Sequence, residues 1–171
     1  MPSFLAPATA QTEGKFYCGQ TYDSIGKTNV PATLMSSPRR AKPIVVIAWK
    51  SQYFGGNFTP QQRCAIVSPK FQAAYAAGNF EYLKVGKEGN LPIVCAVKTE
   101  NQRCTRAEML FTLKPFGNTQ SQLNALMGNI EGGEAGPDIY QSSSSQTEGI
   151  VNIREFFNSA THIPLVRSPK K

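Results

Sequence analysis

The sequence predicts an α+β fold in which an antiparallel sheet of about five strands packs against one long helix, with short helices toward the C-terminus. Among the 171 residues, 12 prolines and 14 glycines separate short apolar runs, which disfavours a helical bundle or coiled coil. Apolar residues alternate with polar ones in several short segments but recur at helical spacing in one, residues 60–77. A chain of this length has room for one compact core.

Three segments in the first part of the chain have strand character. Residues Lys15–Gln20 alternate and are rich in strand-forming side chains, and residues 31–36 supply another short strand. Residues 43–50 form a continuous apolar run, which is typical of a central strand. These segments predict the first half of the sheet.

One long helix has a clear start signal. Thr59 is the expected N-cap, Pro60 occupies the first helical position, and Gln62 completes a capping box. Gly78 is a natural C-cap. Pro69 falls on the solvent side of the helical wheel, so we expect the helix to continue through it and to curve around the sheet, convex toward water.

A hairpin and a third antiparallel strand follow the helix. Residues Phe80–Gly86 alternate as a half-buried strand does, and residues Leu91–Val97 return after a Gly-containing turn. Residues 109–113 form the next strand. Residues Gln122–Met127 and Asn152–Phe157 are predicted to form short helices.

The chain divides into a single domain with two tails. Residues 14–127 are expected to form the disulfide-bonded α+β domain, and residues 128–171 form an acidic, Gly/Ser-rich extension with a short helix. Residues 1–13 resemble the end of a secretory signal followed by a disordered start, since Ala8-Thr-Ala10 has the form of a cleavage site. The basic start of such a signal is missing. The alternative is an ordinary disordered N-terminus.

The four cysteines favour structural disulfides. Cys18, Cys64, Cys95 and Cys104 form no C-x-x-C pair and have no histidine nearby, so they lack the ligand spacing of zinc and redox motifs. We expect no metal and no cofactor. An even number of cysteines beside a possible export signal favours an oxidising compartment, whereas four free thiols in a reducing cytosol are the alternative.

Two cysteine pairings remain open. We favour Cys95–Cys104, because its short loop lies beside a predicted turn, which leaves Cys18–Cys64. Cys64 is expected to face the sheet from the helix, as that bond requires. The rival pairing, Cys18–Cys95 with Cys64–Cys104, would be preferred if the first strand ran directly beside the strand of Cys95.

The net charge of +7 is unevenly distributed. Residues 14–114 contain 14 Lys and Arg against 5 Asp and Glu, whereas residues 131–155 are acidic. Such a field favours an anionic membrane surface or an acidic membrane protein as partner, and no nucleic-acid motif is present. The tightest cluster is a weak basic patch in a proline-flanked loop, made by Arg39, Arg40 and Lys42. A merely solvated basic surface is the alternative.

No catalytic motif stands out. His162 lies near the C-terminus, and no Ser or Cys occupies a nucleophile motif that would use it. Trp49 could form an aromatic binding site with Tyr53, Phe54 and Phe58, but we expect it to anchor the core beside the helix. No apolar run approaches the roughly 18 to 20 residues of a membrane-spanning helix.

Several motifs follow one another along the chain: Phe16-Tyr-Cys18, Pro31-Ala-Thr33, Ile47-Ala-Trp49, Phe58-Thr-Pro-Gln-Gln-Arg-Cys64, Val67-Ser68, Phe71-Gln72, Tyr82-Leu-Lys-Val-Gly86, Ile93-Val-Cys95, Cys104 and Leu110-Phe-Thr-Leu-Lys-Pro115. In this order they resemble the circadian-oscillating-polypeptide domain of cyanobacteria, over about residues 14–127. Pro69 departs from the family pattern. The resemblance implies an exported, membrane-associated cyanobacterial protein without an established reaction. It supplies no catalytic residues and gives the four cysteines a structural role.

Two functions are therefore expected as alternatives. The first is an exported, non-enzymatic accessory or binding protein, peripheral to the thylakoid or plasma membrane and located in the thylakoid lumen or periplasm. The second is a small exported hydrolase or ligand-processing enzyme whose site is assembled from scattered residues. Its candidates would be Asp23, Arg63 and Glu81, although their spacing does not recommend them.

Overall fold

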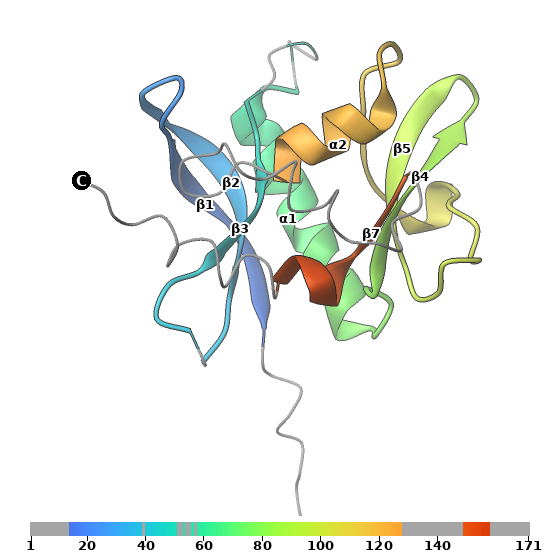
Figure 1. Ribbon diagram of the computed structural model, residues 1–171, viewed down its shortest axis with the longest axis horizontal. Coiled ribbons are helices and arrows are strands. Elements are labelled where there is room, and N and C mark those ends of the chain that lie inside the picture. Colours follow the sequence, from blue (N-terminus) through green and yellow to red (C-terminus); the bar gives the residue numbers. More distant parts are fainter. Residues whose placement is uncertain are drawn as a thin grey trace, which may run out of the picture.

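Figure 1 shows the computed structural model, in which two antiparallel sheets flank one long helix. The structure describes residues 14–127, apart from 39, 51, 52, 54, 55 and 57, and residues 149–157. The elements, in chain order, are β1 (Lys15–Asp23), β2 (Thr28–Ser36), β3 (Ile44–Ala48), α1 (Pro60–Ala76), β4 (Tyr82–Glu88), β5 (Leu91–Val97), the 3-10 helix η2 (Arg106–Glu108), β6 (Met109–Thr112), α2 (Thr119–Met127) and β7 (Ile150–Asn152). A short helical segment at residues 153–157 follows β7.

The α+β class is confirmed, but the expectation of a single sheet is wrong. One sheet has the order β1-β2-β3 and the other has the order β6-β5-β4-β7. Alternation along the chain identifies strands but not their partners, and here α1 separates the two sets of strands (Figure 1). β7 is three residues long and pairs with the outer edge of β4, so periodicity could not identify it.

The long helix α1 forms as its signals predict. The Thr59 hydroxyl accepts a hydrogen bond from the Gln62 amide, and the Gln62 side chain accepts one from the Thr59 amide, which completes the capping box. Pro69 is exposed within an uninterrupted helix. Gly78 follows the C-cap with φ of 78°, a left-handed conformation that glycine adopts without strain.

The two sheets share one core across α1. Phe71 of α1 packs against Phe16 of β1 at a ring-centroid distance of 5.8 Å and against Phe80, just before β4, at 5.4 Å. The rings of Trp49, after β3, and Phe111, in β6, meet edge to face at 5.2 Å. Because these rings come from, or lie beside, both sheets and the helix between them, the two sheets share a single main core.

A buried polar network crosses the same core. The Trp49 indole nitrogen donates to the Thr33 hydroxyl at 2.9 Å, and that hydroxyl shares a hydrogen bond of 2.7 Å with Ser68 of α1. Thr33 and Ser68 are both buried. Each polar group has a partner in the core, so the network joins β2, α1 and the segment after β3 without an unsatisfied donor at Trp49.

A second, smaller core lies under the loop between β5 and β6. Ile93, Cys95 and Val97 of β5 are buried there, away from the main core. Burial on both faces explains why β5 is a continuous apolar run rather than an alternating one. Gly86 of β4 lies beneath the loop, where a Cβ would come within 2.8 Å of the Cys104 Cβ.

Both favoured disulfides are present. Cys18 of β1 is bonded to Cys64 of α1, and Cys95 of β5 is bonded to Cys104 in the loop, each with a Cα–Cα distance of 5.5 Å. All four cysteines are paired, so the rival connectivity does not occur. The first bond attaches the start of α1 to the first sheet, and the second attaches the β5–β6 loop to the second sheet.

Replacing Thr33 with valine should destabilise the protein, because the Trp49 indole and the Ser68 hydroxyl lose their buried partner. We expect the free energy of unfolding to fall by about 1 to 3 kcal/mol in urea denaturation. The matched control is Thr28→Val, at the exposed start of the same strand, which should change it by less than about 0.5 kcal/mol. Equal effects of the two substitutions would contradict a structural role for the network.

Removing the two disulfides separately should have unequal effects. The bonds span sequence separations of 46 and 9 residues. The loop-entropy model then predicts that the free energy of unfolding falls by roughly 4 kcal/mol in Cys18→Ala with Cys64→Ala. It predicts a fall of roughly 3 kcal/mol in Cys95→Ala with Cys104→Ala. Urea denaturation of the two double variants measures this order. A larger loss from the shorter loop would show that chain entropy does not govern their contribution.

Candidate functional site

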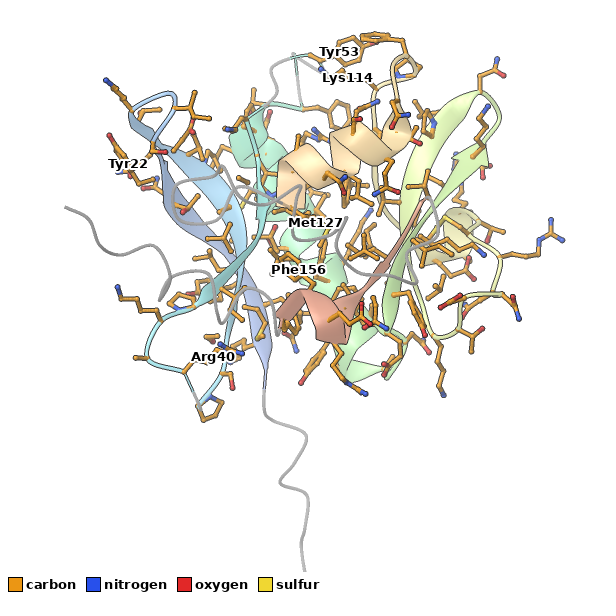
Figure 2. All side chains as sticks on the ribbon, viewed as in Figure 1. Tyr22, Arg40, Tyr53, Lys114, Met127 and Phe156 are labelled. Atoms are coloured by element: carbon orange, nitrogen blue, oxygen red, sulfur yellow. A yellow bond between two sulfur atoms is a disulfide. The ribbon has the colours of Figure 1, made fainter. Side chains whose placement is uncertain are left out.

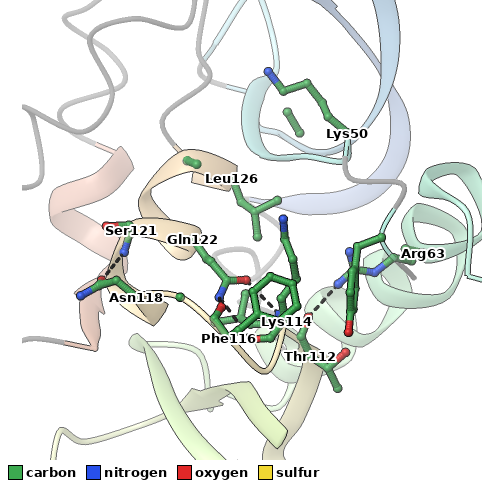
Figure 3. A pocket seen from close by; sticks show the side chains of 14 residues that line it. Lys50, Arg63, Thr112, Lys114, Phe116, Asn118, Ser121, Gln122 and Leu126 are labelled. Carbon is green, nitrogen blue, oxygen red and sulfur yellow. Dashed lines mark hydrogen bonds between the residues drawn. The ribbon is translucent and has the colours of Figure 1, made fainter. Parts of the chain in front are cut away.

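A cavity of about 740 Å³ opens where the start of α1, the chain after β3, the end of β6 and α2 meet. Figure 3 shows this cavity and the side chains around it. The lining residues are Ala48, Lys50, Tyr53, Arg63, Thr112, Leu113, Lys114, Phe116, Gly117, Asn118, Ser121, Gln122, Ala125 and Leu126. Because these come from both halves of the chain, the cavity depends on the packing of the two sheets around α1.

Arg63 forms a cationic part of the wall. Its side chain lies on the buried face of α1, and the residue is 6% exposed. One guanidinium nitrogen donates to the Thr112 carbonyl at 2.7 Å, and the guanidinium carbon lies 4.8 Å from the centroid of the Trp49 ring. Desolvation by burial lowers the pKa of Arg63 to about 10, so the group is still charged at neutral pH. The hydrogen bond and the ring contact fix its orientation.

Lys50 contributes a second cation and is held by Asp23. The Lys50 Nζ lies 3.3 Å from Asp23 Oδ1, and the same carboxylate accepts hydrogen bonds from the amides of Ile25 and Gly26. Desolvation raises the pKa of Asp23, but the hydrogen bond and charge of Lys50 and the two amides outweigh it, so the pKa lies below its ordinary value. A Cβ at position 26 would come within 2.6 Å of the carboxylate, so glycine permits this close turn.

The loop between β6 and α2 carries the third cation, and Gln122 of α2 holds this loop in place. The Gln122 side chain accepts from the Lys114 amide at 2.9 Å and donates to the carbonyls of Lys114 and Phe116. The Lys114 Nζ lies 6.0 Å from the Phe116 ring centroid, and that ring meets Tyr53 edge to face at 5.3 Å. Lys114 and the two rings therefore have defined positions at the rim.

The remainder of the wall is apolar or neutral. Ala48, Leu113, Ala125 and Leu126 supply aliphatic surface, and the lining includes no Asp, Glu, His or Cys. The cavity lining thus combines three basic side chains, two aromatic rings and an aliphatic wall. Among the described residues, no group of three or more His, Cys, Asp or Glu side chains has the arrangement of a metal site.

The weak basic patch predicted from the sequence is separate from this cavity. Arg40 and Lys42 lie in the loop between β2 and β3, and Arg39 lies outside the described residues. In Figure 2, Arg40 is at the opposite side of the molecule from Tyr53 and Lys114.

The scattered candidates for an enzyme do not form one site. Asp23 pairs with Lys50, Arg63 lines the cavity, and Glu81 forms an ion pair with Arg154 at 3.7 Å, outside the cavity lining. His162 lies outside the described residues. Trp49 is 1% exposed, which confirms the core position expected for it.

Sequence reasoning missed the cavity itself. Lys114 belongs to a family motif and Phe116 follows that motif in a loop, but nothing in the motif indicates a cavity; both residues line the same cavity as Arg63 because β6 packs beside α1. One signal was available: Arg63 precedes Cys64 on the apolar face of the helix, where a charged residue is unusual.

Fold and site together define a small, disulfide-bonded α+β domain with a cationic, partly aromatic cavity. Residues 15–158 match the family described as circadian oscillating protein COP23, and the chain belongs to that family. The match continues beyond the segment 14–127 and includes β7. No curated protein and no solved structure gave a match to the chain.

Two features of the structure bear on its compartment. The two disulfides indicate an oxidising, extracytoplasmic space. Within the described residues, no helix has both the length and the apolar character needed to cross a membrane.

Asp23→Asn should change how stability depends on pH. A carboxylate with a lowered pKa in the folded state stabilises that state above its unfolded pKa, and this stabilisation is lost as the pH falls through the folded value. The variant should therefore be less stable than the wild type at pH 7, and the difference should shrink below about pH 4. Thermal unfolding from pH 2 to 7 measures it. Glu100→Gln, at an exposed position, is the control, and a pH-independent difference for Asp23→Asn would contradict the ion pair.

Proposed function

We propose that this protein is an exported, non-enzymatic accessory protein that binds peripherally to an anionic membrane surface or an acidic membrane protein, and not to nucleic acid. The observation that carries the proposal is the excess of positive charge on a disulfide-bonded domain: 14 Lys and Arg against 5 Asp and Glu in residues 14–114. The disulfides support export to the periplasm or the thylakoid lumen, because such bonds persist in oxidising compartments.

Exposure of the basic side chains supports an electrostatic contact. Most of them face solvent, for example Lys27, Lys42, Lys70, Lys87, Lys98 and Arg103. Arg106 is paired with Glu88 at 3.8 Å, and the Arg106 side chain is 73% exposed, so solvent screens the pair. Each cation near an anionic membrane adds about 1 kcal/mol of attraction.

The composition of the cavity supports binding rather than catalysis. Ser121 in the lining has no imidazole or carboxylate beside it in that lining to act as a general base. The four thiols are oxidised and therefore supply no nucleophile. A cationic cavity whose lining has no imidazole, carboxylate or free thiol suits recognition of a ligand.

Binding to vesicles should depend on anionic lipid and on salt. The full oxidised chain should co-sediment with vesicles containing phosphatidylglycerol, should fail to co-sediment with neutral phosphatidylcholine vesicles, and should be released by about 1 M salt, where the screening length is roughly 3 Å. Arg40→Gln with Lys42→Gln should weaken binding by about tenfold or more. The comparison variant Lys87→Gln with Lys98→Gln removes the same charge from β4 and the residue after β5. An equal loss would show that total charge governs binding, and a smaller loss would show that the loop between β2 and β3 makes the contact. Binding that persists in high salt would contradict an electrostatic contact.

A further inference from the structure

The cavity combines two properties that together specify a class of ligand. Its volume of about 740 Å³ lies within the range of roughly 300 to 1,000 Å³ that is typical of small-molecule sites. Its lining has cations from three separate segments, Lys50, Arg63 and Lys114, and no acidic side chain. A neutral apolar ligand would leave these charges desolvated, whereas a highly polar anion would leave the aliphatic wall unused.

The cations differ in what they can offer a ligand. Lys50 is engaged by Asp23 at 3.3 Å, so part of its charge is neutralised. Lys114 has no ion pair with any described residue, and in Figure 3 its side chain extends from the loop toward Leu126 of α2. Arg63 is buried and keeps its charge despite desolvation. Positive potential in the cavity therefore comes mainly from Arg63 and Lys114.

The apolar surface lies next to these charges. Leu113 is adjacent to Lys114 in the chain, Ala125 and Leu126 line the cavity from α2, and the rings of Phe116 and Tyr53 form its rim. A ligand with a flat or aliphatic body could pack against this wall while its charged end lies near the two cations.

The site is also organised before any ligand binds. Arg63 is fixed by the Thr112 carbonyl and the Trp49 ring, and the loop of Lys114 is fixed by three hydrogen bonds to the Gln122 side chain. Little conformational freedom then remains to be lost on binding, which favours affinity.

We infer that this cavity binds a small amphipathic anion, an organic molecule with an apolar or aromatic body and one carboxylate-like or sulfonate-like end, held by Arg63 and Lys114. The anion can come from a free organic acid or from the anionic lipid of a membrane, which present the same chemistry. Ligand binding in this one open cavity is independent of the proposed electrostatic contact with vesicles, which uses the exposed charges elsewhere on the surface.

The test uses two fluorescent probes with the same ring system. 8-Anilinonaphthalene-1-sulfonate carries an anion, and N-phenyl-1-naphthylamine does not. The full oxidised chain should bind one equivalent of the sulfonate and should bind the neutral probe at least about tenfold more weakly, because a charge-assisted contact contributes that much. Equal affinities for the two probes would overturn the inference.

Substitutions then assign the binding to this cavity. Lys114→Met should weaken the affinity for the sulfonate by about tenfold and leave the affinity for the neutral probe unchanged. Lys87→Met, which removes one charge on β4, should change neither affinity.

A second pair of variants adds a side chain at the cavity wall. Ala125 is exposed on α2, a position that tolerates helix-forming residues. Ala125→Glu should therefore weaken sulfonate binding more than Ala125→Gln, which adds the same bulk without the charge. Thermal unfolding of each variant verifies that it is folded. Equal losses in Lys114→Met and Lys87→Met would mean diffuse attraction and would overturn the inference.

Competition identifies the source of the anion. Displacement of the sulfonate probe from the wild type by decanoate, but not by decanol, supports a free organic acid. Displacement by phosphatidylglycerol vesicles that is lost in Lys114→Met supports an anionic lipid. If neither competitor displaces the probe, the inference is overturned. The salt-dependent contact with vesicles is tested separately, by co-sedimentation.

Discussion

The contacts of one buried side chain, Trp49, join the first sheet, the second sheet and the helix between them. Its indole nitrogen donates to Thr33 of β2, its ring meets the edge of Phe111 of β6, and the guanidinium of Arg63 of α1 lies over its ring. These three partners belong to the first sheet, the second sheet and the helix between them. Trp49 is therefore one point, in addition to the cluster of Phe16, Phe71 and Phe80, at which the two sheets are joined around α1, and the cavity lies beside it.

The disulfide of α1 reinforces the same junction. Cys64 follows Arg63 in the helix and is bonded to Cys18 of β1, so the first turns of α1 cannot move away from the first sheet. From this fixed position Arg63 reaches the Thr112 carbonyl at the end of β6. A covalent constraint on one side and a charge-assisted hydrogen bond on the other thus hold the buried cation at the cavity wall.

Local signals in the sequence predict most of the elements and favour the disulfide pairing that the structure has, but they do not predict how the sheets assemble. Thr59, Pro60 and Gln62 predict the start of α1 because capping is a contact between near neighbours. The continuous apolar run of β5 predicts a buried strand, yet it does not show that one of its faces would be covered by the loop of Cys104. The second sheet and the cavity arise from pairings between distant segments, such as β4 with β7, which periodicity does not encode.

In the motif at the start of α1, most residues have a role in folding, whereas one lines the cavity. Within Thr59-Pro-Gln-Gln-Arg-Cys64, the threonine and second glutamine cap the helix, the proline begins it, and the cysteine bonds it to β1. Arg63 is different, because a buried apolar side chain of similar volume would pack against Trp49 without the cost of desolvating a charge. Folding alone therefore gives little reason for an arginine at this position. A cavity that requires positive charge in its wall does give such a reason, and Arg63 lines that cavity.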